Sequence, residues 1–147
     1  MDNDIVVLKF ADSKIPEFKE RKNRDYINYG DNNLYHETLL KLYDKSAKHG
    51  AIVNGKANYI FGKGLKRKSN SSEESPVVNR TGETQDEVMK KAILDREIYG
   101  GFRLMIIWGS TGTSFEMYHV EFHKIRTGKE PGTFFYKDDW KDSQEQM

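Results

Sequence analysis

Apolar residues recur at helical spacing in three stretches of the chain, and turn residues separate these stretches. The first two helices are expected at about 34–48 and 50–61, with a bend near Gly50 between them. A third helix is expected at about 82–99. The residues expected to cap or stop these helices are Asp31, Asn32 or Asn33 for the first, Gly62 and Gly64 for the second, and Thr81 or Thr84 and Gly100–Gly101 for the third. The apolar stripe formed by Leu39, Leu42, Ile52 and Ile60 is expected to be core.

After residue 101 the apolar period changes from that of a helix to that of a strand. Strands are expected at 102–108, 113–120 and 133–137, and the residues "GSTG" between the first two predict a hairpin turn. A further strand, "DIVVLKF", is expected at 4–10. The order of a strand, then helices, then an antiparallel β-meander indicates the α+β class.

The chain is long enough for one ordinary domain or for part of a larger one. Its expected organisation is an N-terminal strand and extended arm at 1–33, a helical pair at 34–62, a polar flexible insertion at 63–81, a helix plus β-meander at 82–140, and a polar tail at 141–147.

The segment "GAIVNGKA", at 50–57, resembles a nucleotide-binding P-loop but lacks its last residue. Ala57 stands where a Ser or Thr hydroxyl would bind Mg²⁺. The segment also lies between two predicted helices, whereas a P-loop follows a buried strand. We therefore interpret Lys56 as an ordinary helical residue.

Composition excludes several classes of protein. Net charge is +1, so no overall field attracts the chain to nucleic acid or membranes. The absence of cysteine excludes disulfides and thiolate metal sites, and suits a reducing compartment. The apolar run near the N-terminus is too short for a signal peptide, and no stretch is long enough to span a membrane. A soluble, cytoplasmic protein without a membrane partner is expected.

Two histidines in "HVEFH", His119 and His123, are the candidate metal ligands. The surrounding pattern predicts a strand, on which positions i and i+4 lie about 13 Å apart. One metal ion cannot bridge that distance, so surface or interface histidines are expected. A metal-dependent enzyme is kept as a minor alternative.

No catalytic arrangement is predicted elsewhere. The "GSTGTS" segment at 109–114 lacks a lysine and suits a hairpin turn better than a phosphate loop. The adjacent carboxylates Glu73/Glu74 and Asp138/Asp139 lack the contrasted environments of an acid–base pair. We therefore expect no catalytic residue, no metal and no cofactor, and a chain that is not an enzyme.

A basic cluster formed by Lys63, Lys66, Arg67 and Lys68 supplies possible, weak phosphate contacts. No aromatic platform accompanies it, and acidic residues follow closely, so a solvated loop is expected. A small nucleic-acid-binding or regulatory module that uses this cluster is the main alternative function.

The segment "YINYGDNNLYHETLLKLYDKSAKHGAIVNGKANYIFGKGL", at 26–65, resembles the N-terminal signature of tailed-bacteriophage portal proteins. The stretches "LDREIYGGFRLMIIW", at 94–108, and "IRTGK…FFYKDDW", at 125–140, are similar to later parts of the same region. The family-motif positions are Gly30, Asn32, Asn33, Leu39, Leu42, Ser46, His49, Ile52, Lys56, Tyr59, Ile60, Gly62, Gly64, Gly101 and Trp140.

The resemblance covers the wing-like part of a portal protein and about 115 residues of this chain. Nothing here corresponds to the stem helices, the clip or the crown of the family. The chain is therefore expected to be a truncated portal gene, as in a decaying prophage, a deliberately shortened chain, or a portal-like domain used alone.

The resemblance implies a structural role in virion assembly. A portal forms a ring of identical subunits at one capsid vertex, where capsid and scaffold proteins, terminase and tunnel DNA are its partners and the tail later attaches. The expected location is the virion or the cytoplasm of the bacterial host. For this chain we expect structural roles: Asn32 as a helix cap, the Leu39/Leu42/Ile52/Ile60 stripe as core, and Gly62 and Gly64 as a helix stop.

Overall fold

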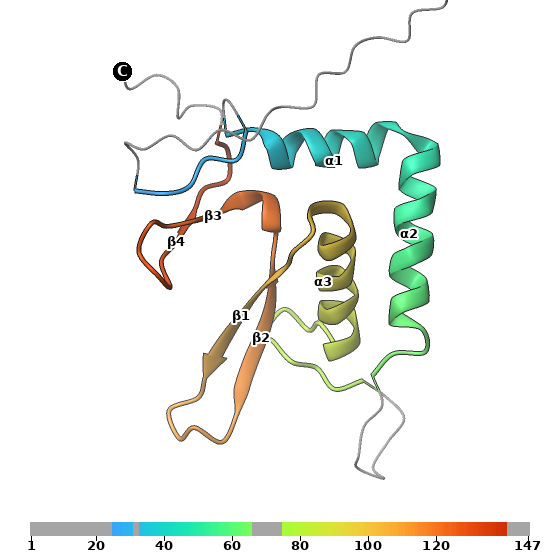
Figure 1. Ribbon diagram of the computed structural model, residues 1–147. Helices are drawn as coiled ribbons and strands as arrows, with labels where there is room; N and C mark the ends of the chain where they lie inside the picture. Colours follow the sequence, from blue (N-terminus) through green and yellow to red (C-terminus); the bar gives the residue numbers. More distant parts are fainter. Residues whose placement is uncertain (1–24, 31–32, 66–74, 141–147) are drawn as a thin grey trace, which may run out of the picture.

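The computed structural model describes residues 25–30, 33–65 and 75–140, which confirm the α+β class (Figure 1). The elements are α1 (Tyr35–Lys45), α2 (Ala47–Phe61), α3 (Gln85–Tyr99), β1 (Arg103–Trp108), β2 (Phe115–Val120), the short 3₁₀ helix η1 (Phe122–Lys124), β3 (Ile125–Thr127) and β4 (Phe134–Tyr136). In Figure 1, α3 lies between α2 and the hairpin of β1 and β2. The strand expected at 4–10 and the tail at 141–147 lie outside the described residues.

Helices α1 and α2 meet at a sharp corner at Ser46, four residues before the bend expected near Gly50 (Figure 1). The Ser46 backbone is extended, and its hydroxyl accepts a hydrogen bond from the backbone N–H of His49 at 3.3 Å. Ser46 therefore acts as the N-cap of α2, because its side chain satisfies a donor that the first turn leaves free. Gly50 instead lies inside α2, buried against Tyr43 of α1.

The two glycines inside α2 provide a matched test of this corner. A Cβ on Gly50 would lie 2.9 Å from the backbone oxygen of Tyr43, whereas a Cβ on Gly55 would meet nothing within 4 Å. We expect Gly50→Ala to lower the free energy of unfolding by about 1–3 kcal/mol, because a backbone atom cannot easily move away. Gly55→Ala should raise it by about 0.5–1 kcal/mol through helix propensity. Urea unfolding of both variants measures these changes, and equal effects would contradict the close approach.

The N-terminus of α1 corrects the expectation that Asn33 caps this helix. The N-cap residue is Leu34, which has no side-chain capping bond. The side-chain oxygen of Asn33 accepts instead from the backbone N–H of Tyr29 at 3.2 Å and from Arg126. Asn33 also has a positive φ of 62°, a conformation that asparagine tolerates better than most residues. The other two proposed caps, Asp31 and Asn32, lie outside the described residues.

Helix α3 begins with a complete capping box at Thr84, one of the two threonines expected to cap it. The Thr84 hydroxyl accepts from the backbone N–H of Glu87, and the Glu87 carboxylate accepts from the backbone N–H of Thr84 at 2.7 Å. The helix ends at Gly100 in the left-handed conformation, φ 80°. The expectation of a Thr84 start and a glycine stop is confirmed, although the helix begins at Gln85 rather than at 82.

The expected hairpin is confirmed: β1 pairs with β2 in antiparallel register, with Trp108 opposite Phe115 at the turn and Arg103 opposite Val120 at the far end. The "GSTGTS" segment forms its loop, closed by a hydrogen bond from the Gly109 N–H to the Ser114 carbonyl at 2.9 Å. Residues 77–81, at the end of the expected insertion, are held against β2, where the Met117 N–H donates to the Val78 carbonyl at 2.8 Å.

The expectation of one continuous β-meander is wrong, because the described strands form two separate two-stranded sheets. Strand β4 pairs with β3, which lies at 125–127, where no strand was expected. The short helix η1 interrupts the chain between β2 and β3 and turns it away from the first sheet (Figure 1).

The core between the helices consists of small side chains. Val53 and Ala57 of α2 are buried, as are Val88 and Ala92 of α3. Small residues let two helices approach closely, so the longer side chains on either side of the contact remain outside it. The expectation that the Leu39/Leu42/Ile52/Ile60 stripe is core is therefore wrong for three of its members: Leu42, Ile52 and Ile60 are 48%, 54% and 43% exposed.

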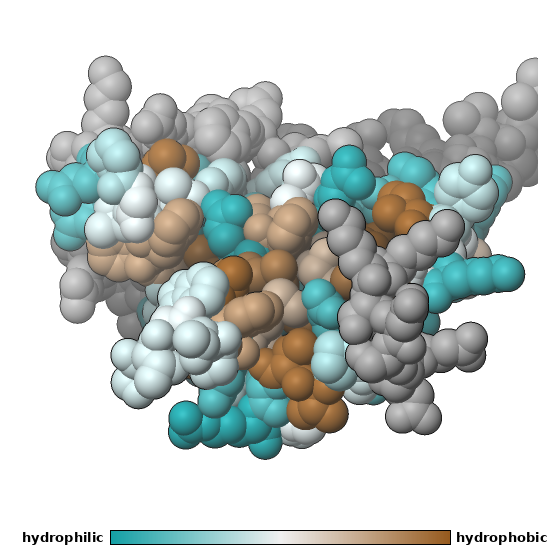
Figure 2. Space-filling model, turned by 90° about the horizontal axis from the view of Figure 1, so that it is seen from below, coloured by the Kyte–Doolittle hydropathy of each residue, from teal (hydrophilic) through white to brown (hydrophobic). Residues whose placement is uncertain are grey.

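Apolar side chains also remain on the surface of β1 and its surroundings. Figure 2 shows apolar residues gathered near the middle of the lower face, with hydrophilic residues around them. The exposed large apolar residues of the hairpin are Met105, Ile106, Ile107, Trp108 and Phe115. The described part of the chain thus leaves a substantial apolar surface in contact with solvent.

Candidate functional site

A completely buried arginine, Arg126 of β3, connects the separate parts of the fold. Its Nε donates to the side-chain oxygen of Asn33 at 2.6 Å, and its Nη2 donates to the Asn33 backbone oxygen at 2.7 Å. These two bonds fix the arm before α1 onto β3 through the planar fork of the guanidinium. Asn33 and Arg126 are 93 residues apart in the sequence.

The remaining contacts of the Arg126 guanidinium are also with neutral groups. Nη1 donates to the backbone oxygens of His123 and Ile125 at 2.7 and 2.9 Å. Its carbon lies 4.7 Å from the centre of the Trp140 ring, within the range of a cation–π contact. Burial lowers the pKa of Arg126 to about 10, and the group remains charged at neutral pH.

His36 of α1 lies beside this arginine, with its Nδ1 3.3 Å from Nη1 of Arg126. The imidazole stacks on the Tyr29 ring at 4.6 Å and packs against Phe122 at 5.1 Å. Burial, and then the positive charge of Arg126, lower the pKa of His36 to about 3. A neutral imidazole can accept a hydrogen bond from the guanidinium, so burial and hydrogen bonding favour the same protonation state.

A second polar contact joins α3 to the hairpin. Nε2 of His119 lies 2.7 Å from the Asp95 carboxylate, and both side chains are almost buried. The same carboxylate oxygen accepts from the backbone N–H of Phe122 at 3.1 Å. The expectation of a surface or interface histidine is therefore wrong for His119, because Asp95 holds it inside the fold.

His123 and His119 lie on different elements. His123 lies in η1 and packs near Tyr99, with the ring centres 6.3 Å apart. Burial, followed by the charge of Asp95, raises the pKa of Tyr99 above its usual range. Within the described ranges, no group of three or more histidine, aspartate or glutamate side chains is close enough to hold a metal ion. This arrangement gives no support to the metal-enzyme alternative.

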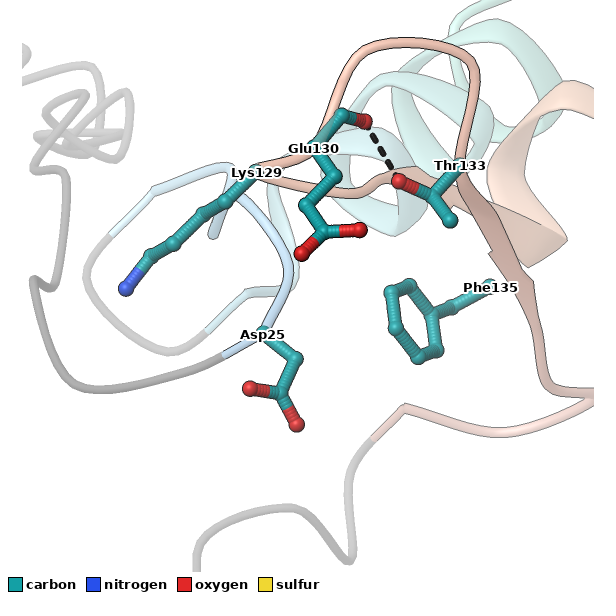
Figure 3. Close-up of a pocket in the computed structure, with 5 residues that line it drawn as sticks. All are labelled: Asp25, Lys129, Glu130, Thr133 and Phe135. Atoms are coloured by element: carbon teal, nitrogen blue, oxygen red, sulfur yellow. Dashed lines mark hydrogen bonds between the residues drawn. The ribbon is translucent and has the colours of Figure 1, made fainter.

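Figure 3 shows an open hollow of about 370 Å³ between the arm and the β3–β4 loop. Its lining residues are Asp25, Lys129, Glu130, Thr133 and Phe135. Thr133 donates to the backbone oxygen of Glu130, and the Lys129 N–H donates to the Asp25 carbonyl, so the loop is tied to the arm. The hollow combines polar and aromatic surface. The hydroxyl of Thr133, however, bonds to a backbone oxygen and not to the carboxylate of Asp25 or Glu130.

A second open hollow, of about 270 Å³, lies between α1 and the end of the described chain. It is lined mainly by charged side chains: Glu37, Leu40, Lys41, Asp44, His123, Asp138 and Asp139. Asp138 accepts from Tyr136 and forms an ion pair with Lys124 at 3.2 Å, which holds the pKa of Asp138 below its usual value. Asp138 thus ties the end of the described chain to Lys124 of η1.

The structure brings several family-motif positions together around Arg126. Asn33 and Trp140 contact its guanidinium directly, and the backbone of Gly101 lies so close to the Phe122 ring that a Cβ would be 3.0 Å from it. Trp140 also donates through its indole N–H to the Lys124 carbonyl at 3.1 Å. Gly30 is buried in the arm with a φ of 83°.

Other motif positions serve the helical pair or remain on the surface. Lys56 lies within α2, as expected, and pairs with Glu97 of α3 at 2.9 Å. The "GAIVNGKA" segment is helical throughout, which agrees with the prediction that it is not a P-loop. Gly62 and Gly64 follow the end of α2, and Tyr59 is 89% exposed. In the basic cluster, Lys63 is exposed, whereas Lys66, Arg67 and Lys68 lie outside the described residues.

Sequence reasoning missed Arg126, His36 and Asp95. Arg126 lies in "IRTGK", where the glycine and lysine suggested a loop, and a single arginine beside Ile125 carries no signal of burial. His36 and Asp95 lie on predicted helices, where their polar character suggested exposed faces. Their partners are far away in the sequence, so no local spacing could identify them.

None of the described helices is long and apolar enough to cross a membrane. No family model, no curated protein and no solved structure matches this chain. An inference about its function must therefore rest on its own residues and on the resemblance noted in its sequence.

Proposed function

We propose that this chain is the N-terminal, wing-like part of a tailed-phage portal protein, a structural subunit of the ring through which DNA is packaged and ejected. The observation that carries the proposal is the uncovered apolar surface on the portal-like segments. Ile52 and Ile60 of α2 are about half exposed, and Trp108 of β1 is 64% exposed. A subunit that packs against neighbours or against further domains requires such a surface.

The buried network around Arg126 supports the proposal by giving the subunit a defined shape. The three portal-like stretches, 26–65, 94–108 and 125–140, all contribute to this network or to its aromatic surroundings. A ring subunit must present its contact surfaces at fixed angles, and buried hydrogen bonds to the guanidinium fork provide that fixed geometry. The side chains of the site thus have positioning roles, and the chain performs no chemistry of its own.

The proposal is tested in the bacterial host that encodes the chain. An antibody against the chain should label one vertex of the capsids that the host produces, as seen by immuno-electron microscopy. Deletion of the coding sequence should leave capsids without packaged DNA, and the native chain should restore packaging. Unlabelled particles, or DNA-filled particles after the deletion, would overturn the proposal.

A pair of α2 variants tests the apolar surface itself. Ile52→Asp should reduce the yield of DNA-filled particles at least about tenfold, because a carboxylate at a buried subunit contact costs more than 1 kcal/mol. Asn58→Asp adds the same charge at an exposed position of the same helix and should leave the yield within about twofold. Equal yields for the two variants would show that this surface makes no contact in the particle.

A purified-chain experiment separates the nucleic-acid alternative from the portal proposal. Binding to duplex DNA that weakens steeply with salt would support the alternative, if neutralising Lys63, Lys66, Arg67 and Lys68 together abolishes it. The portal proposal expects no such binding at low salt, because the resemblance covers the wing-like part of the family and not the stem helices that line the DNA tunnel.

A further inference from the structure

The edge of β1 that faces away from β2 carries a defined set of backbone groups. The Gly109 N–H donates to the Ser114 carbonyl at the hairpin turn, so this pair belongs to the hydrogen-bonded type, and the two types of pair alternate along the hairpin from there. The N–H and C=O groups of Leu104, Ile106 and Trp108 therefore point away from β2. Among the described residues, no backbone group pairs with them.

The opposite edge of the hairpin confirms this alternation. Met117, opposite Ile106, donates its N–H to the Val78 carbonyl at 2.8 Å, and its own carbonyl accepts from the Asn79 side chain at 3.0 Å. The backbone groups of Met117 thus point away from β1, as the alternation requires. Val78 and Asn79 cover the middle of the β2 edge, whereas the described chain places no such segment along β1.

The side chains of β1 are those of a strand inside a sheet. Met105 and Ile107 lie on one face of the hairpin and Ile106 and Trp108 on the other, and all four are about half exposed or more. The stretch 104–108 contains neither a charge nor a proline, which are the residues that normally protect an edge strand from pairing. Such an edge is a template for another strand that is also apolar on both faces.

We infer that this strand is the β1 of a second copy of the chain, so that two hairpins join in one sheet with the strand order β2–β1–β1–β2. In the antiparallel register centred on Ile106, this residue faces its own counterpart, Met105 faces Ile107, and Leu104 faces Trp108. Every one of these pairs is apolar, and the outward backbone groups of one copy meet those of the other. The edge is therefore self-complementary, as a two-fold contact requires.

Charge and space both favour this arrangement. Arg103 is the one charged residue of β1, and in this register it faces Gly109 of the second copy, beside the loop 109–114, which carries no charge. The two arginines then lie about 20 Å apart along the sheet, whereas a parallel arrangement in register would place them side by side. Helix α3 packs mainly on β2, the strand farther from the second copy, so this helix leaves the β1 edge open.

This two-fold contact differs from the contacts of a portal ring. A two-fold contact uses the same surface on both copies and closes after two, whereas a ring is built from head-to-tail contacts between two different surfaces. The dimer is thus an association of the chain in addition to the proposed ring. Its presence or absence in solution leaves the portal proposal to the experiments on particles described above.

Sedimentation velocity of the native full chain over a series of concentrations tests the dimer. The sedimentation coefficient should rise from that of a monomer to that of a dimer as concentration increases. Ile106→Lys places two ammonium groups opposite each other at the centre of the contact and should weaken dimerisation at least about tenfold. Tyr59→Lys adds the same charge on α2, at a side chain that is 89% exposed, and should leave the dissociation constant within about twofold.

A charge swap tests the position of the two-fold axis. Ile106→Glu alone should weaken dimerisation as Ile106→Lys does, because each variant again faces its own charge. An equal mixture of the two variants should restore the dimer, since only the mixed pair places opposite charges together. Circular dichroism of each variant alone checks that the substitution leaves the chain folded.

A measurement that needs no variant is the nuclear Overhauser contact between differently labelled native copies. Leu104 of one copy should show contacts with Trp108 of the other. A native chain that remains a monomer at about 1 mM would overturn the inference. So would an Ile106→Lys variant that dimerises like the native chain, or a mixture of folded Lys and Glu variants that stays monomeric.

Discussion

Arg126→Met is expected to lower the free energy of unfolding by about 3–5 kcal/mol, measured by urea denaturation with circular dichroism. Methionine fills a similar apolar space but cannot donate hydrogen bonds. The backbone oxygens of Asn33, His123 and Ile125 would then lose the donor that Arg126 supplies, whereas the side-chain oxygen of Asn33 would keep its bond from the Tyr29 N–H. Each buried acceptor without a partner costs about 1–3 kcal/mol, and three such groups account for the expected loss.

Two controls separate the network from the charge itself. Arg126→Lys keeps the positive charge but loses the planar fork, so it should recover part of the loss at most. Arg80→Met removes an arginine whose side chain is 84% exposed and pairs with Glu116. Exposed pairs contribute about 0–1 kcal/mol, so this variant should remain close to the native stability. An Arg126→Met variant within 1 kcal/mol of the native chain would contradict the role of the network.

Acid should destabilise the protein through His36. The pKa of His36 falls from 6.5 to about 3 on folding, so the unfolded chain binds a proton at a higher pH than the folded chain. The contribution of His36 to the free energy of unfolding is complete above pH 6.5 and is lost as the pH falls toward 3. Between these two pH values, proton binding to His36 stabilises the unfolded state. At 1.36 kcal/mol per pH unit, the loss reaches about 4–5 kcal/mol.

The measurement is a series of urea unfolding curves between pH 7 and pH 3. Carboxylates such as Glu83, whose pKa lies below its usual value because of Lys91, add acid sensitivity to every variant. The His36 contribution is therefore the difference between the native chain and His36→Phe, whose ring keeps the stacking on Tyr29 but cannot bind a proton. His49 of α2 lies outside this network and supplies the control, so His49→Gln should not reproduce the effect of His36→Phe. Parallel curves for the native chain and His36→Phe would refute the assignment.

Local signals in the sequence predicted both ends of α3 because those signals act within a few residues. Thr84 and Glu87 form a capping box three residues apart, and Gly100 adopts the left-handed conformation that stops α3. The corner between α1 and α2 was misplaced because both Ser46 and Gly50 suit a break. The contact of Gly50 with Tyr43, which resolves the choice, joins two different helices.

Hydrophobic period predicted which segments are strands but not how the strands associate. The hairpin follows from its alternation and its short turn, but its register, with Trp108 opposite Phe115, was not predicted. The separation of β3 and β4 into a second sheet depends on η1, a single turn whose position is not marked by any local pattern. The core was mispredicted for a related reason: α2 faces α3 through Val53 and Ala57, so the larger residues that strengthen the pattern lie outside the contact.

The sequence by itself determined the α+β class, three helices with their stop signals, the hairpin and the helical character of the P-loop-like segment, because propensity and capping depend on neighbours in the chain. The tertiary structure alone decided the buried network. Arg126 becomes a buried residue only when Asn33, His36 and Trp140, from three distant segments, surround it. Burial and hydrogen bonding between such segments are properties of the folded chain, and no periodicity in the sequence records them.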